Sequence, residues 1–234
     1  MPLFGIDPIY FLFVGPALIL SLIASWLTKS RFNKYSKVRN ARGITGAEAA
    51  QLMLDRAGIT DVKVVPHQGF LSDHYNPLTK TLALSPDVYS QPSIAAVGVA
   101  CHEAGHAVQH ARSYAPMWVR SALVQPANIG SSIGMYSMMG GLLFQSQSMV
   151  LIGAVLFSAV LLFQVITLPV EFDASARAKK LAFEYNIVTP HERAGVAKVL
   201  NAAALTYVAG AISTLLTLLY FLFRAGLLGG RSDD

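Results

Sequence analysis

The chain has 234 residues, of which 53% are hydrophobic and only 13% charged, and its mean hydropathy is +0.48. Soluble domains carry about 25% charged residues, so this composition argues against a soluble protein and favours an integral membrane protein. The net charge of +5 comes from basic residues beside long apolar stretches, where they orient the chain and contact anionic lipid headgroups. Nucleic acid is therefore not an expected partner, although Phe32 and Tyr35 interleave with one basic run.

The first predicted element is a membrane span over residues 8–28, which carry no charge. Only Asp7 precedes it, and six basic residues follow it closely: Lys29, Arg31, Lys34, Lys37, Arg39 and Arg42. The positive-inside rule therefore places the N-terminus outside and residue 29 onward in the cytoplasm. A cleavable signal would begin with a basic segment, which this chain lacks, so we expect the span to remain as an anchor.

A small folded unit is predicted between this span and the next apolar block. Thr45-Gly46-Ala47-Glu48 is a capping box that predicts a helix to about Ala57, with Gly58 as its C-cap. Residues 62–65 and 80–85 are expected to be strands, separated by a polar, aromatic loop at 67–77. In the second strand, Leu82 and Leu84 alternate with Thr81, Ala83 and Ser85. This strand is expected either to offer an exposed edge to an extended substrate or to belong to a plain scaffold hairpin.

Residues 102–106 read His-Glu-Ala-Gly-His, an HExxH motif, within a predicted helix from about Ser93 to Ala111. Positions i and i+4 share a helix face, so His102 and His106 direct two imidazoles to one point, as two zinc ligands require. Glu103 is then the expected general base. The alternative is a coincidental pair of structural histidines. The single cysteine, Cys101, is expected to face the core rather than the metal, and its isolation fits a reducing cytoplasm.

Two further uncharged blocks complete the membrane part. Residues 121–170 are long enough for two spans, predicted at 123–144 and 149–168 around a polar tip at 145–148, and a last span is predicted at 205–223. Gly130 and Gly134 have a small-xxx-small spacing, which lets a neighbouring helix approach closely. The alternative is a buried helical hairpin in a soluble protein. We therefore expect a mainly α integral membrane protein with about four transmembrane helices and a small cytoplasmic, zincin-like α+β catalytic unit.

The third zinc ligand must come from outside the motif helix. A metzincin would place Gly at position 108 and His at 112, where this chain has Val108 and Arg112, and His110 lies too far around the helix. Glu171 is the candidate, because two spans return the chain to the cytoplasmic face just before it. Pro169 is expected to start a helix there, so Glu171 is alternatively a simple helix-cap acid. Asp173 is the fallback ligand or an N-terminal charge.

Three segments resemble the neutral zinc metallopeptidase family of bacterial membranes, the YugP-type peptidases: VACHEAGHAVQHA, LPVEFDASARA and AALTYVAGAI. The resemblance extends over nearly the whole chain. It implies a membrane zinc peptidase with ligands at His102, His106 and Glu171 and a catalytic Glu103. More remotely the chain is similar to HtpX and CAAX prenyl proteases, which carry an Asp four residues after the ligand glutamate. Ser175 occupies that position here, which leaves open whether Asp173 or Ser175 supports the metal site.

The expected activity is hydrolysis of peptide bonds, in a peptide or membrane protein, with one Zn²⁺ per chain. It takes place at the cytoplasmic face of a bacterial cytoplasmic membrane. Candidates for stabilising the oxyanion are Tyr207, His74, Tyr75 and Asn76. The main alternative is a zinc-binding membrane adaptor without catalysis; spans free of ionisable residues disfavour a channel or transporter. The expected domains are an anchor (1–28), the zincin-like unit (29–120), a membrane hairpin (121–170), a cytoplasmic helical segment with the third ligand (171–204) and a final span with its tail (205–234).

Overall fold

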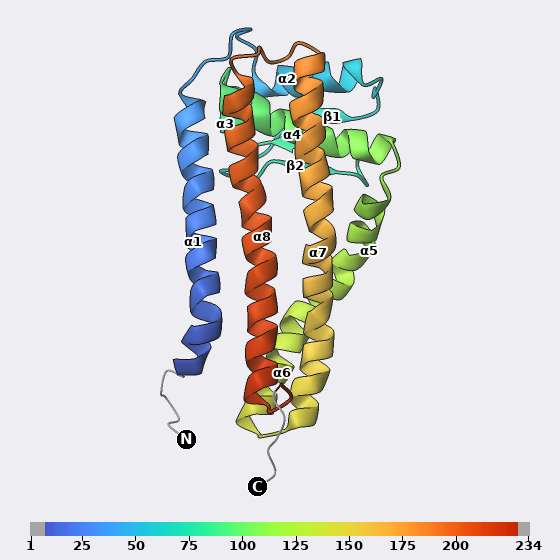
Figure 1. The fold of residues 1–234 in the computed structure, drawn as a ribbon. Helices are drawn as coiled ribbons and strands as arrows, with labels where there is room; N and C mark the ends of the chain where they lie inside the picture. Colours follow the sequence, from blue (N-terminus) through green and yellow to red (C-terminus); the bar gives the residue numbers. More distant parts are fainter. Residues whose placement is uncertain (1–7, 229–234) are drawn as a thin grey trace. The chain divides into compact units, whose positions relative to one another are not determined.

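The computed structural model describes residues 8–228. Its elements are, in chain order (Figure 1), α1 (Pro8–Ser36), α2 (Gly46–Arg56), β1 (Lys63–Pro66), β2 (His74–Asn76), β3 (Thr81–Leu84), α3 (Pro86–Tyr89), α4 (Ile94–Ala111), α5 (Ala115–Ile129), the π-helix η1 (Gly130–Gly134), α6 (Met135–Leu143), α7 (Gln147–Glu184) and α8 (Arg193–Arg224). The described chain divides into two compact units. We call residues 8–24, 118–168 and 206–228 the helical unit, and residues 25–117 and 169–205 the α+β unit.

Within residues 8–228, three helices are long and apolar enough to cross a membrane: α1, α7 and α8. They contain the predicted spans at 8–28, 149–168 and 205–223 and extend beyond them. Many of their large apolar side chains are exposed, including Leu12, Leu22 and Val155. Exposed apolar side chains on uncharged helical segments of this length are what lipid contact requires.

The predicted span at 123–144 is helical but interrupted, because the five-residue π-helix η1 separates α5 from α6. No single helix there reaches the length of a span, so a fourth span stays a prediction. The close helix approach predicted at Gly130 and Gly134 is confirmed. A Cβ on Gly130 would lie 2.1 Å from the carbonyl oxygen of Leu156, and one on Gly134 would lie 2.7 Å from the amide nitrogen of Phe157. These segments therefore touch α7 backbone to backbone.

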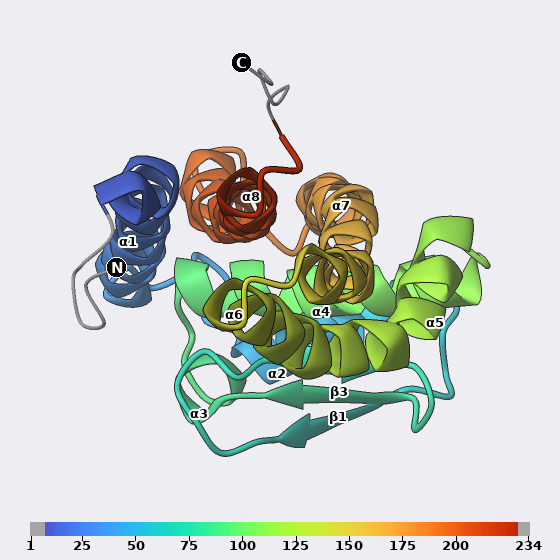
Figure 2. The same cartoon turned by 90° about the horizontal axis from the view of Figure 1, so that it is seen from below.

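The α+β unit contains a three-stranded sheet in the order β1-β3-β2. Strand β3 pairs in parallel with β1 and antiparallel with β2. Figure 2 shows β1 and β3 side by side, with α2 and α4 covering one face of the sheet. Two expectations are corrected here. The segment 67–77 is not all loop, because it contains β2, and β3 is the central strand, so it offers no free edge.

Helix α4 is the buried centre of this unit. It begins where expected, with the Ser93 hydroxyl accepting the Ala96 N–H at 3.1 Å. Helix α2 also begins as predicted, with the Thr45 and Glu48 side chains forming the capping box. Cys101 is fully buried in the core, as expected, and burial raises the pKa of its thiol to about 12. Small apolar residues make up most of α4, which lets its neighbours pack closely around the motif.

Helix α7 continues through Pro169 without a break, so the predicted helix start at that proline is wrong. A proline inside a helix removes one backbone hydrogen bond, and long apolar helices tolerate this loss. Glu171 therefore lies inside a continuous helix. Its carboxylate is not a cap acid of a first turn, which removes that alternative reading of the residue.

Candidate metal centre

Helix α4 presents His102 and His106 from one face, with their ring centroids 4.8 Å apart. Gly105, between them, allows α7 to approach. A Cβ on Gly105 would lie 2.7 Å from the carbonyl oxygen of Ala174, so any larger residue would separate the two helices. The motif glycine therefore has a packing reason, because it brings the segment after Glu171 against the two histidines.

Three side chains converge at this contact: His102, His106 and Glu171, whose candidate ligand atoms all lie within 4.8 Å of one another. Oε2 of Glu171 lies 3.2 Å from Nε2 of His102 and 3.5 Å from Nε2 of His106. Tetrahedral zinc with bonds of about 2.0–2.1 Å holds its ligand atoms about 3.3 Å apart. Both nitrogen-to-oxygen distances thus fit a cation placed between the three side chains.

The tautomer of His106 is fixed by Gln109, one turn further along α4. The amide nitrogen of Gln109 donates to the carbonyl oxygen of Val170 and to Oδ2 of Asp173, both at 2.8 Å. Its oxygen therefore faces Nδ1 of His106 at 2.9 Å and accepts a hydrogen bond from the Nδ1–H group. With Nδ1 protonated, Nε2 of His106 keeps its lone pair directed at the cluster, which is the arrangement metal-binding histidines require.

His102 is also contacted at Nδ1, by a different residue. The Ser175 hydroxyl lies 3.1 Å from Nδ1 of His102, while Nε2 faces Glu171. Asp173 contacts neither histidine; it accepts from Gln109 and is paired with Arg177. Of the two residues left open by the sequence, Ser175 contacts a motif histidine directly and Asp173 acts one step further away, through Gln109.

Electrostatics at the cluster favour a positive charge. Burial lowers the pKa of His106, but the carboxylates of Glu171 and Glu103 outweigh it, so the net pKa is raised. Glu171 is 2% exposed and Glu103 7% exposed, so these carboxylates are poorly screened by water. Nearby, burial and the charge of Glu103 raise the pKa of Asp73, whereas hydrogen bonds from Ser85 oppose this. The two imidazoles and one carboxylate of His102, His106 and Glu171 match the donor set that Zn²⁺ prefers.

The model of the family described as "Putative neutral zinc metallopeptidase" matches residues 10–226. The chain belongs to this family. A relative described as "Putative membrane protease YugP", from Bacillus subtilis (strain 168), is 45% identical over 218 residues, which cover 93% of this chain and 96% of the relative. No solved structure matches the chain. The family resemblance expected from the sequence is thus confirmed, and the chain is a member of a membrane zinc metallopeptidase family.

The residues predicted as candidates for stabilising the oxyanion contact parts of the protein outside the three-ligand cluster. The Tyr75 hydroxyl lies 2.8 Å from Nδ1 of His110, so these two side chains join β2 to α4. Asn76 accepts the amide of Leu78, and His74 bonds the carbonyl of Ser72. Tyr207 belongs to the helical unit, where it lines a pocket.

Sequence reasoning missed Gln109, and it named Ser175 without deciding whether Ser175 or Asp173 supports the metal site. Helical spacing could have indicated that both residues lie near the site. Gln109 follows His106 by three residues and Ser175 follows Glu171 by four, and residues at these spacings are neighbours on a helix surface. Asp73 accepts hydrogen bonds from the amide and the hydroxyl of Ser85, and the charge of Glu103 acts on it. No pattern in the sequence indicated these contacts.

Proposed function

We propose that this protein is a membrane-embedded peptidase that holds one zinc ion on His102, His106 and Glu171 and uses Glu103 as its general base. The observation that carries the proposal is the convergence of two Nε2 atoms and one carboxylate oxygen, each imidazole held at Nδ1 by a second residue. A coincidental histidine pair would not require this second layer of contacts. Family membership and the membrane protease relative support the same activity.

Zinc, when bound, acts as a Lewis acid that acidifies a water molecule and polarises the scissile carbonyl. Glu103 takes the proton from the attacking water and later delivers it to the leaving amine. Glu103 is buried beside His106, so bulk water screens its charge poorly. Its electrostatic interactions are therefore stronger than they would be at the surface. Gln109 fixes the tautomer of His106, and the Ser175 hydroxyl orients the ring of His102 through its contact with Nδ1.

An extended substrate has a natural place along β2. This strand is at the edge of the sheet, next to β3, and it packs against α4, the helix with the motif. The strand predicted to offer this edge, at 80–85, is central, so we assign the substrate-binding edge to β2, His74–Asn76, instead. Main-chain pairing along such an edge binds peptides with little dependence on side chains.

The cytoplasmic face of a bacterial cytoplasmic membrane is the proposed location of the site. The six basic residues after the first span and the second basic group, Arg177, Lys179 and Lys180, all belong to the α+β unit that holds His102 and Glu171. The positive-inside rule applied to both groups gives the same side. The substrate is then a peptide or a membrane-protein segment within reach of the bilayer surface.

The test is hydrolysis of a fluorescein-labelled unfolded protein by the peptidase reconstituted in liposomes. We expect Glu103→Gln to keep its zinc and lose at least about a hundredfold in rate, as loss of a general base requires. The matched control is Glu184→Gln, an exposed glutamate on α7, which should retain full rate. Equal rates of hydrolysis in Glu103→Gln and wild type would contradict the general-base role of Glu103, and zinc binding without hydrolysis in wild type would favour the adaptor.

A further inference from the structure

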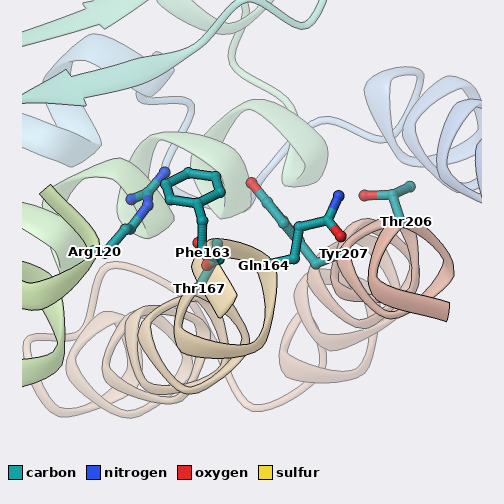
Figure 3. Close-up of a pocket in the computed structure, with 7 residues that line it drawn as sticks. Arg120, Phe163, Gln164, Thr167, Thr206 and Tyr207 are labelled. Atoms are coloured by element: carbon teal, nitrogen blue, oxygen red, sulfur yellow. The ribbon is translucent and has the colours of Figure 1, made fainter. Parts of the chain in front are cut away.

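The helical unit contains a second candidate site, which is lined by none of the metal-centre residues. A pocket of about 330 Å³ is lined by Arg120, Phe163, Gln164, Thr167, Thr206, Tyr207 and Gly210, all within this unit. In Figure 3 the labelled side chains come from α5, α7 and α8. Nothing in the proposed peptide hydrolysis uses this pocket.

The pocket contains a buried hydrogen-bond acceptor without a donor. Within residues 8–228, Oε1 of Gln164 is the buried side-chain atom for which the structure offers no hydrogen-bond partner. Buried acceptors are nearly always paired, and an unpaired one in an apolar setting is costly. Gly210 faces the same amide: a Cβ there would lie 3.7 Å from Nε2 of Gln164, so the absence of a side chain at 210 leaves room beside it. Such an acceptor calls for a donor from a ligand.

The remaining lining residues define the ligand's charge. Arg120 is the one charged side chain among the described residues that line the pocket, and Thr206 and Tyr207 add hydroxyls. The Thr167 hydroxyl donates to the carbonyl oxygen of Phe163, so it could serve a ligand only as a hydrogen-bond acceptor. A ligand that suits this lining carries an anionic group for Arg120 and an N–H or O–H donor for Gln164.

The chain positions place the pocket at headgroup depth. Arg120 stands just before the predicted span 123–144, Gln164 and Thr167 near the end of 149–168, and Tyr207 at the start of 205–223. In the expected topology these three span ends face the cytoplasmic leaflet. Basic pockets between membrane helices at that depth bind lipid headgroups.

We propose that this pocket binds the headgroup of a glycerophospholipid whose phosphodiester pairs with Arg120 and whose hydroxyl or ammonium group donates to Oε1 of Gln164. Phosphatidylglycerol supplies the hydroxyl, and phosphatidylethanolamine supplies the ammonium N–H. Phosphatidylcholine has the same phosphodiester but no donor, because its nitrogen is fully methylated. The site therefore discriminates by the presence of a donor rather than by the phosphate.

Native mass spectrometry of the full chain, released from detergent after addition of each lipid, tests the proposal directly. We expect wild type to retain phosphatidylglycerol or phosphatidylethanolamine about fivefold more than phosphatidylcholine, which is the effect of one hydrogen bond. The better of the two donor-bearing lipids identifies the donor as hydroxyl or ammonium. The wild-type ranking requires no substitution, so the test does not depend on any variant folding.

Three variants sharpen the assignment. Gln164→Met keeps the size of the side chain without its acceptor and should abolish the preference over phosphatidylcholine. Arg120→Gln should weaken retention of all three lipids by about tenfold or more, and Gly210→Leu should block them by filling the pocket. Arg56→Gln, which removes the same charge from an exposed site on α2, should match wild type. Circular dichroism melting of each variant establishes that it is folded.

Two results would overturn the proposal. One is equal retention of phosphatidylcholine by wild type, or a donor preference that survives in folded Gln164→Met. The other is a co-purified peptide, rather than a lipid, whose retention depends on Gln164 and Arg120, because this would make the pocket a substrate subsite. Neither result bears on zinc binding at His102, His106 and Glu171, so failure here is distinguishable from failure of the proposed peptidase.

Discussion

Replacing Gln109 by leucine isolates the contribution of the residues behind the metal ligands. Gln109 is fully buried, and its amide makes three hydrogen bonds, to His106, Val170 and Asp173. Leucine has a similar size, so packing is largely kept while all three bonds are lost. The Nδ1 proton of His106 and the carboxylate of Asp173 each lose a partner inside the protein.

The expected magnitude follows from these bonds. Loss of a residue that orients a ligand histidine typically costs tenfold to a hundredfold in metal affinity, or about 1.4–2.7 kcal/mol. Two neutral hydrogen bonds contribute roughly 1 kcal/mol each to folding and the bond to Asp173 about 1.5–3 kcal/mol. Gln109→Leu should therefore lower stability by roughly 3–5 kcal/mol and weaken zinc binding by one to two decades.

Competition between the protein and a zinc-sensitive chelating dye measures the affinity, and thermal melting in detergent measures the stability. The control is Gln51→Leu on α2, where an exposed amide donates to Asp55 at 2.8 Å, and we expect its melting temperature and zinc affinity to match wild type. A folded Gln109→Leu variant with wild-type zinc affinity would refute the idea that Gln109 fixes the tautomer of His106.

Three further outcomes are expected. Gly134→Ala should lower the melting temperature, because its new Cβ would meet the α7 backbone at 2.7 Å, whereas Gly15→Ala, with nothing within 4 Å, should not; equal effects would contradict the close approach. Burial raises the pKa of Asp73, so the folded state binds its proton more tightly than the unfolded state, and this carboxyl lowers stability as pH rises from about 4 through the folded pKa. Asp73→Asn should remove that decline in pH-dependent melting, and an unchanged profile would count against it. Cys101 should react with iodoacetamide at pH 8 only after unfolding, because burial raises its pKa to about 12; rapid labelling of the native protein would be inconsistent with the fold.

Local signals predicted the fold well where short-range interactions decide it. The capping box at Thr45 and the helix that begins after Ser93 depend on contacts three residues apart, and both are present. The sheet order was not predictable in the same way, because the pairing of β3 with both β1 and β2 depends on residues far apart in the sequence. The prediction at Pro169 failed because it used a local rule alone. Proline is common at the start of a helix, but here the long apolar helix α7 continues through it.

The candidate site was predicted in part from spacing and in part from topology. The spacing of His102 and His106 within a helix is enough to place them on one face. Glu171 came from the expectation that a hairpin returns the chain to the motif, and it lies beside both histidines even though the helix start proposed for it is absent. The contacts of Gln109 and Ser175 depend on how closely α4 and α7 pack at Gly105, which no pattern in one sequence reveals.

Zinc content per chain tests the central claim most directly, measured by elemental analysis of detergent-purified wild type, Glu171→Ala and Glu103→Gln. We predict about one zinc in wild type and in Glu103→Gln, and a loss or strong weakening in Glu171→Ala, because Glu171 binds the metal and Glu103 acts on water. Zinc retained at full affinity in Glu171→Ala, or absent from metal-replete wild type, would contradict a metal centre formed by His102, His106 and Glu171.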